Sequence, residues 1–230
     1  MSALEIVLVS VCSFLVAGII VAIIINIYLN KFKVNRVYDF YEMDEVNHSD
    51  IVFLGDSLTD FFPAHELLKK KVLNRGVAGD TTEDVLKRIN EILEVKPKVV
   101  YLQIGINDMI YNRKITCVEI KDRVFNVIKV LQDNNIIVRL ISLYPINRKK
   151  MAFTWVVCKF ANNKKIIETN KLLKEEAEKK NIDFIDVHDK LLGDDGNLKK
   201  EFTVEGLHLS IKGYKTIVPA FNDHLEKENL

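Results

Sequence analysis

The chain has 230 residues, of which 48% are hydrophobic and 28% are charged. Its 33 Lys and Arg residues nearly balance 32 Asp and Glu residues, so the formal net charge is +1. This composition excludes an intrinsically disordered protein, which combines low hydrophobicity with high net charge. The lack of a basic surplus also argues against nucleic-acid binding through charge. Three distant cysteines, Cys12, Cys117 and Cys158, indicate neither a disulfide framework nor a zinc ribbon.

The N-terminal residues 1–36 differ in composition from the rest of the chain. No charged residue occurs between Ile6 and Asn30, and about 20 apolar residues in a helix span a hydrocarbon layer of roughly 30 Å. A core helix of a soluble protein would show a polar face, and this segment has none. A cleavable signal peptide, the stronger alternative, would begin with a basic segment and end at a small-residue cleavage site. We therefore expect a single-pass membrane anchor over residues 6–29.

Basic residues lie on one side of this expected anchor. Lys31, Lys33 and Arg36 follow it, whereas only Glu5 and the amino terminus precede it. The positive-inside rule then favours a cytoplasmic location for the C-terminal domain, by a margin of three charges. This domain, residues 37–230, is near neutral and long enough to form one well-buried core.

Five short apolar runs in the C-terminal domain predict buried strands, because each ends near a glycine, proline or aspartate. The runs are residues 51–54, 72–74, 99–104, 136–141 and 182–185.

Helical patterns lie between the predicted strands. Capping boxes predict one helix starting after Thr81 and continuing through Leu93, and another starting after Thr116. Apolar spacing predicts a third helix over about residues 163–180, and a last helix follows Ser210. This alternation predicts an α/β fold with a mostly parallel five-stranded sheet and helices on both faces.

Polar and glycine-rich clusters follow the first three strands, at residues 55–58, 76–82 and 105–108, and a fourth at 205–210 precedes the last helix. Ligands of open α/β sheets bind outside the carboxyl ends of the strands. We therefore expect the four clusters to meet at one rim of the sheet.

The residue types in these clusters fit acyl transfer. A serine becomes a useful nucleophile when a base takes its proton, and Ser57 and His208 are the candidate pair. Glu205, three residues before His208, can orient the imidazole. Gly79 can present a backbone N–H and Asn107 a side-chain amide to a developing oxyanion, together with the Ser57 N–H.

These blocks resemble the SGNH hydrolases, also called the GDSL esterase/lipase family. Gly-Asp-Ser-Leu stands at residues 55–58, Gly-x-Asn-Asp at 105–108, and His208 is followed by Gly213-Tyr214. The stretch 74–82 is especially similar to the platelet-activating-factor-acetylhydrolase-like and acetylesterase-like branches. The resemblance runs over about residues 50–214.

The resemblance implies a flavodoxin-like three-layer α/β/α sandwich, preceded here by the N-terminal helix. It also implies Ser57 as nucleophile and His208 as base. The Ser57 amide, Gly79 and Asn107 would form the oxyanion hole.

Glu205 departs from the family pattern, which usually has aspartate three residues before the histidine. Other serine hydrolases accept glutamate in the orienting position. The alternative is a Ser–His dyad in which Glu205 is a surface turn residue. For Asp56, Asp80 and Asp108, which flank the site residues, capping and loop hydrogen bonds are favoured over a metal site.

An apolar cluster lies between the fourth strand and the third helix, at Met151, Phe153, Trp155, Val156, Val157 and Phe160. It fits an acyl-binding lid, a patch on the membrane surface, or an ordinary helix packed on the core.

The sequence thus predicts a membrane-anchored serine esterase that acts on a small-molecule, lipid or carbohydrate ester, favours short-chain or acetyl esters, and uses neither metal nor organic cofactor. Two alternatives stay open. The same triad can transfer an acetyl group to a sugar hydroxyl, or the glutamate can mark a decayed site in an anchored binding module.

Overall fold

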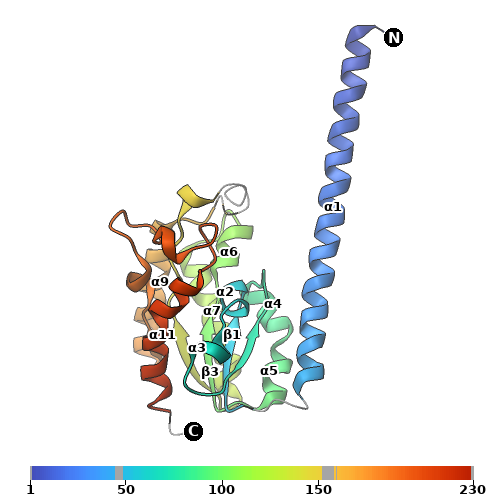
Figure 1. Ribbon diagram of the computed structural model, residues 1–230. Coiled ribbons are helices and arrows are strands. Elements are labelled where there is room, and N and C mark those ends of the chain that lie inside the picture. The colour runs from blue at the N-terminus through green and yellow to red at the C-terminus, as the bar shows by residue number, and fades with distance from the viewer. Residues whose placement is uncertain (1, 45–48, 152–157, 159, 229–230) are drawn as a thin grey trace. The chain divides into compact units, whose positions relative to one another are not determined.

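The computed structural model describes residues 2–44, 49–151, 158 and 160–228 (Figure 1). The chain divides into two compact units, residues 1–43 and 44–230. The first unit is a single long helix, α1, Ala3–Asp44. Its segment Ala3–Tyr28 is, within the described residues, the one stretch long and apolar enough to cross a membrane. The helix continues past residue 36, where we placed the end of the N-terminal segment, and that boundary stays a prediction.

The second unit is built on a five-stranded sheet in the order β2-β1-β3-β4-β5, with every pair of neighbouring strands parallel. Figure 1 shows helices on both sides of this sheet, so the predicted three-layer α/β/α fold is confirmed. The strands agree with the five predicted runs and are β1 Ile51–Gly55, β2 Leu73–Gly76, β3 Val99–Gln103, β4 Ile137–Ile141 and β5 Asp183–Ile185.

The longer helices start where the sequence signals place them. The capping boxes of Thr81 and Thr116 are both formed, at the starts of α4 and α7. Ser210 caps α11 by accepting a hydrogen bond from the Gly213 amide. The helices along the chain are α4 Thr82–Lys87, α5 Ile89–Val95, α7 Cys117–Asp133, α9 Asn163–Lys179 and α11 Ile211–Leu225. Further short helical segments follow strand ends and loops: α2 Ser57–Asp60, α3 Ala64–Leu67, α6 Ile106–Tyr111 and α10 His188–Leu191.

One predicted helix is wrong in its continuity. The apolar spacing from Val85 to Leu93 predicts a single helix, but the structure divides it into α4 and α5 at Arg88. Arg88 has φ −107° and ψ 15°, which lies outside the helical region. Its buried side chain makes polar contacts below the sheet rim, and these tertiary contacts override the local helical pattern.

Side-chain packing in the core and strand pairing fix the carboxyl edge of the sheet, which is the rim where the predicted clusters lie. Phe53 of β1 stacks on Tyr101 of β3 at 4.8 Å between ring centroids, and Phe221 of α11 packs against Phe53 edge-on at 5.6 Å. In β1 every residue is buried, and Gly55 at its end is paired with Gly76 on one side and Gln103 on the other. Three adjacent strands therefore end at the same level, and the predicted clusters follow them there.

Candidate active site

Ser57 stands on a tight strand-to-helix turn. It is the first residue of α2, two residues after the end of β1, and is buried. Asp56 caps this turn, because its Oδ1 accepts a hydrogen bond from the Leu58 amide at 2.9 Å. A Cβ on Gly55 would lie 2.3 Å from the carbonyl oxygen of Gln103, so the turn can pass this close to β3 only with glycine. The backbone around Ser57 is thus fixed from both sides.

Three side chains are joined in series at this turn. The Ser57 Oγ lies 2.9 Å from the His208 Nε2, although the two residues are 151 positions apart. The His208 Nδ1 lies 2.6 Å from the Glu205 Oε1. The same carboxylate oxygen accepts a hydrogen bond from the His208 backbone N–H at 3.1 Å. Glu205 is therefore not a free surface residue. It contacts both the ring and the backbone amide of His208, and these two contacts orient the imidazole.

The loop that carries His208 is closed by its own hydrogen bonds. The His208 carbonyl oxygen accepts from the Thr203 hydroxyl at 2.8 Å and from the Val204 amide at 3.0 Å. The Thr203 hydroxyl oxygen in turn accepts from the Gly206 amide at 2.7 Å. Gly206 has φ +104°, a conformation that side chains disfavour. This closed loop presents the imidazole toward Ser57.

The charge of Glu205 is favoured by its partner. Partial burial raises the pKa of this carboxyl group, but its hydrogen bonds to His208 and its electrostatic interaction with that residue outweigh burial, so the pKa is lowered overall. Glu205 is consequently ionised at neutral pH. An ionised carboxylate hydrogen-bonded to Nδ1 keeps the proton on that nitrogen and leaves Nε2 free to accept one.

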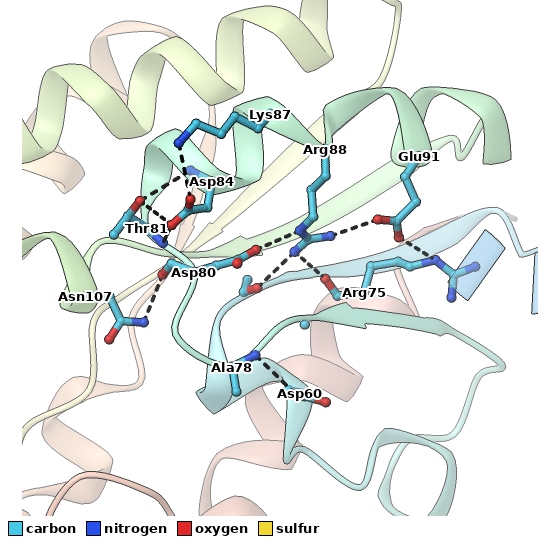
Figure 2. Close-up of polar contacts among 12 residues, drawn as sticks. Asp60, Arg75, Ala78, Asp80, Thr81, Asp84, Lys87, Arg88, Glu91 and Asn107 are labelled. Carbon is cyan, nitrogen blue, oxygen red and sulfur yellow. Dashed lines mark hydrogen bonds and ion pairs between the residues drawn. The ribbon is translucent and has the colours of Figure 1, made fainter. Parts of the chain in front are cut away.

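Gly79 and Asn107 lie on either side of β1, after β2 and β3 respectively. The Asn107 Nδ2 donates a hydrogen bond to the Asp80 carbonyl oxygen at 2.9 Å (Figure 2). This bond uses one of the two amide hydrogens and ties Asn107 to the residue that follows Gly79. Gly79 has φ +82°, so the chain turns there in a conformation suited to glycine. The two predicted oxyanion donors therefore belong to one hydrogen-bonded unit.

Asp56 is a buried carboxyl group next to Ser57. Burial raises its pKa from 3.8 to about 7, against the lowering effect of the Leu58 amide. The nearby carboxylates Asp80 and Asp108 raise it further, whereas His208 lowers it. Within the described part of the chain, no hydrogen-bond partner reaches its Oδ2.

The capping and loop roles predicted for the flanking aspartates are confirmed for Asp56 and Asp108. The Asp108 carboxylate accepts from the Thr82 amide at 2.9 Å and from the Thr82 hydroxyl at 2.7 Å. It thereby joins the start of α4 to the start of α6, which carries Asn107.

Two aromatic side chains flank the site with exposed surface. Phe61, at the end of α2, is 52% exposed and its ring centroid lies 5.0 Å from that of His208. Tyr111, at the end of α6, is 58% exposed, and its hydroxyl lies 3.5 Å from where a Cβ on Gly79 would stand. Of the predicted apolar cluster, residues 152–157 lie outside the described residues, and Met151 is buried.

Sequence reasoning did not find Arg88, whose guanidinium lies under the same rim (Figure 2). The signal available in the sequence was its position eight residues after Asp80, in a segment whose other buried positions include the apolar Val85, Ile89 and Ile92.

A parallel α/β sheet carrying a hydroxyl–imidazole–carboxylate series at its carboxyl edge has the architecture of an acyl-transferring hydrolase. Comparison with known families agrees: the profile of the GDSL-like Lipase/Acylhydrolase family matches residues 53–216. The chain belongs to this family, and the protein is an enzyme of the GDSL/SGNH hydrolase type that acts on ester bonds. No protein with a curated description matches the chain.

Solved structures share the fold over most of the chain. A protein from Streptococcus pneumonia, described as a candidate platelet activating factor, is 25% identical with a TM-score of 0.79, covering 90% of this chain and 98% of its own. The lipase/acylhydrolase from Enterococcus faecalis is 26% identical with a TM-score of 0.61, covering 76% and 94%. The acetyl xylan esterase AlAXEase is 19% identical with a TM-score of 0.61, covering 76% and 98%, which shows the fold alone.

Proposed function

We propose that the protein is a membrane-anchored serine esterase that cleaves a carboxylic ester through an acyl-enzyme. The observation that carries this proposal is the unbroken series from Ser57 through His208 to Glu205, with contacts of 2.9 and 2.6 Å. A hydroxyl, a base and an orienting carboxylate at these distances form the minimal apparatus for activating serine.

In the first half of the reaction, the Ser57 Oγ attacks the carbonyl carbon of the ester while its proton passes to the His208 Nε2. The negative charge on the carbonyl oxygen is stabilised by N–H groups of Ser57, Gly79 and Asn107. One such donor is worth about 3–4 kcal/mol in comparable enzymes. Collapse of the tetrahedral intermediate breaks the bond to the alcohol oxygen, which takes the proton from His208. The acyl group remains on Ser57.

In the second half, a water molecule gives its proton to the His208 Nε2 and attacks the acyl carbon. The Ser57 oxygen leaves, recovers the proton and releases the carboxylic acid. Throughout both halves the ionised Glu205 stabilises the imidazolium that forms twice in each cycle. The lowered pKa of Glu205 supports this role, and it makes the decayed-site alternative the weaker one.

A short acyl or acetyl ester is the proposed substrate class. The resemblance of residues 74–82 to the platelet-activating-factor-acetylhydrolase-like and acetylesterase-like branches supports this choice, and a candidate platelet activating factor is among the similar structures. The exposed faces of Phe61 and Tyr111 would contact the apolar parts of such an ester on either side of the nucleophile.

Anchoring by α1 is part of the proposal, and its support is the span Ala3–Tyr28. At 1.5 Å per residue these 26 residues reach about 39 Å, more than the roughly 30 Å hydrocarbon layer. If α1 is an anchor, the activity of the full chain is recovered in the membrane fraction. Deletion of residues 1–28 then moves the activity to the soluble fraction. Activity in the soluble fraction, with the N-terminus removed, would instead identify a cleaved signal sequence.

The test of the esterase is hydrolysis of p-nitrophenyl esters, from acetate to palmitate, by the full chain in detergent micelles. We expect Ser57→Ala to remove hydrolysis and to retain the circular dichroism of the folded protein. Ser49→Ala, a serine that lies before β1 and outside the site, is the matched control. Activity that survives in Ser57→Ala would reject the proposed nucleophile, and the chain-length optimum tests the short-acyl substrate. Product analysis with an added sugar acceptor separates hydrolysis from acetyl transfer.

A further inference from the structure

Arg88 is a cation buried beneath the rim of the sheet. Its side chain is 7% exposed, and its backbone interrupts the helix between α4 and α5. Burying a charged group without partners costs several kcal/mol. A guanidinium retained at such a place therefore needs acceptors that match its planar fork of five N–H groups.

The acceptors come from three directions, as Figure 2 shows. The Nε of Arg88 contacts the Asp80 Oδ2 at 2.7 Å, and Nη1 contacts the Glu91 Oε2 at 3.3 Å. The Nη2 donates to two backbone carbonyl oxygens, that of Arg75 at 2.9 Å and that of Gly55 at 3.3 Å. These carbonyls stand at the carboxyl ends of β2 and β1.

Each of these partners adjoins the proposed chemistry. Gly55 precedes Ser57 by two residues, and Asp80 follows Gly79 directly. Asp80 is held at both ends, because its carboxylate contacts Arg88 while its carbonyl oxygen accepts the Asn107 amide at 2.9 Å. The Asn107 amide therefore bonds to the backbone of Asp80, and Arg88 fixes the side chain of that same residue. The orientation of the amide depends in this way on Arg88.

A second arginine balances the charge of this group. The Nε of Arg75 lies 3.2 Å from the Glu91 Oε1, so two guanidinium groups face the carboxylates of Asp80 and Glu91. With its charges balanced, the cluster can hold a fixed geometry in the interior without a net buried charge.

We propose that Arg88 is a positioning residue for the oxyanion hole, acting through Asp80 on the Asn107 amide and on the Gly79 turn. The inference rests on the proposed esterase function. Arg88 does not touch the substrate. It aligns donors with the place where negative charge develops, and alignment of donors matters more in the transition state than in the bound ester.

The test is a double-mutant cycle between Arg88 and Asn107 in the full chain in detergent micelles, with p-nitrophenyl acetate as substrate. Arg88→Lys keeps the positive charge but removes the fork. Alone it should lower kcat by about 30-fold and change KM by less than about threefold, because the lost interaction belongs to the transition state. In the Asn107→Ala background the same substitution should lower kcat by less than about fivefold, since the donor that it aligns is gone.

Arg139→Lys is the matched control. Arg139 is a part-buried guanidinium on β4 that contacts Glu228 at 2.7 Å and Asp183 at 3.0 Å, away from the rim. Its substitution should lower stability without changing kcat. If Arg88→Lys fails to fold, Asp80→Asn breaks the same ion pair from the other side and enters the cycle in its place.

The outcomes separate the two proposals. An unchanged kcat in the Arg88 variant, or equal losses with and without the Asn107 amide, would overturn the positioning role in an enzyme that is still an esterase. A wild-type protein without Ser57-dependent hydrolysis would reject the proposed function and the positioning role with it.

Discussion

We expect the Asp56→Asn variant to be more stable than the wild type at alkaline pH and equally stable near pH 4. The substitution is nearly isosteric, and an asparagine Oδ1 can still accept the Leu58 amide that now contacts the aspartate at 2.9 Å. Asparagine is also as good a helix-capping residue as aspartate. What the variant removes is the possibility of a charge on a completely buried side chain.

The expected size of the effect follows from the pKa of Asp56. Burial raises this pKa from 3.8 to about 7. At a pH where Asp56 is ionised in both states, this shift lowers the free energy of unfolding by an amount on the order of 4 kcal/mol. Below pH 3.8 the carboxyl group is protonated in both states and contributes nothing. Between pH 3.8 and about 7 the unfolded chain releases the proton first, so the free energy of unfolding falls as the pH rises. Above about pH 7 the group is ionised in both states, and the free energy of unfolding is lowered by the full amount.

The assay is urea unfolding of the full chain in detergent micelles at about pH 4, 6 and 8, followed by circular dichroism. The difference in free energy of unfolding between variant and wild type reports Asp56 together with its coupling to Asp80, Asp108 and His208, because more distant titrating groups affect both proteins alike. We expect this difference to grow from near zero to several kcal/mol across the series.

A difference that is constant across this pH range would refute the reasoning, because Asp56 would then have the same pKa in the folded and unfolded states. A variant less stable than the wild type at pH 8 would show that the aspartate is stabilised as the anion.

Two further predictions concern the loop of His208. Glu205→Gln keeps an acceptor for Nδ1 but removes the charge, so kcat for p-nitrophenyl acetate should fall by about 10²- to 10⁴-fold; a loss below threefold would support a Ser–His dyad. Gly206→Ala should lower the free energy of unfolding by about 2 kcal/mol or more, because its Cβ would stand 2.5 Å from the Asn147 carbonyl oxygen at φ +104°. Gly196→Ala, at φ +71° with no atom within 4 Å, measures the conformational cost alone, and equal losses would contradict the clash.

The strands and the longer helices were predictable because their signals are local. The capping boxes of Thr81 and Thr116 involve residues three positions apart, and the buried strands are short apolar runs. The break at Arg88 was not predictable in this way. Its cause is a set of acceptors on β1, β2 and Asp80, and a helical spacing pattern contains no information about them.

The candidate site shows the same division. Ser57, His208, Gly79 and Asn107 could be proposed from the sequence because each lies in a short block at the end of a strand or before a helix. The environment of Glu205 depends instead on where the loop of His208 folds, and only the structure places its carboxylate 2.6 Å from the imidazole. The burial of Asp56 could not be predicted either, because its two neighbours in the sequence contain no information about the strands that enclose it.

The order of the site residues along the chain has a consequence for the enzyme's synthesis. Ser57, Gly79 and Asn107 all leave the ribosome well before His208, which lies 151 residues after the serine. Tyr214 of α11, later still, donates a hydrogen bond to the carbonyl oxygen of Leu58, the residue after Ser57, at 2.8 Å. A growing chain therefore carries the serine without a base to activate it and without the helix that braces its turn. Under the proposed roles, such a nascent chain cannot cleave an ester through this triad until the segment with His208 and α11 has been made and has folded against the turn of Ser57.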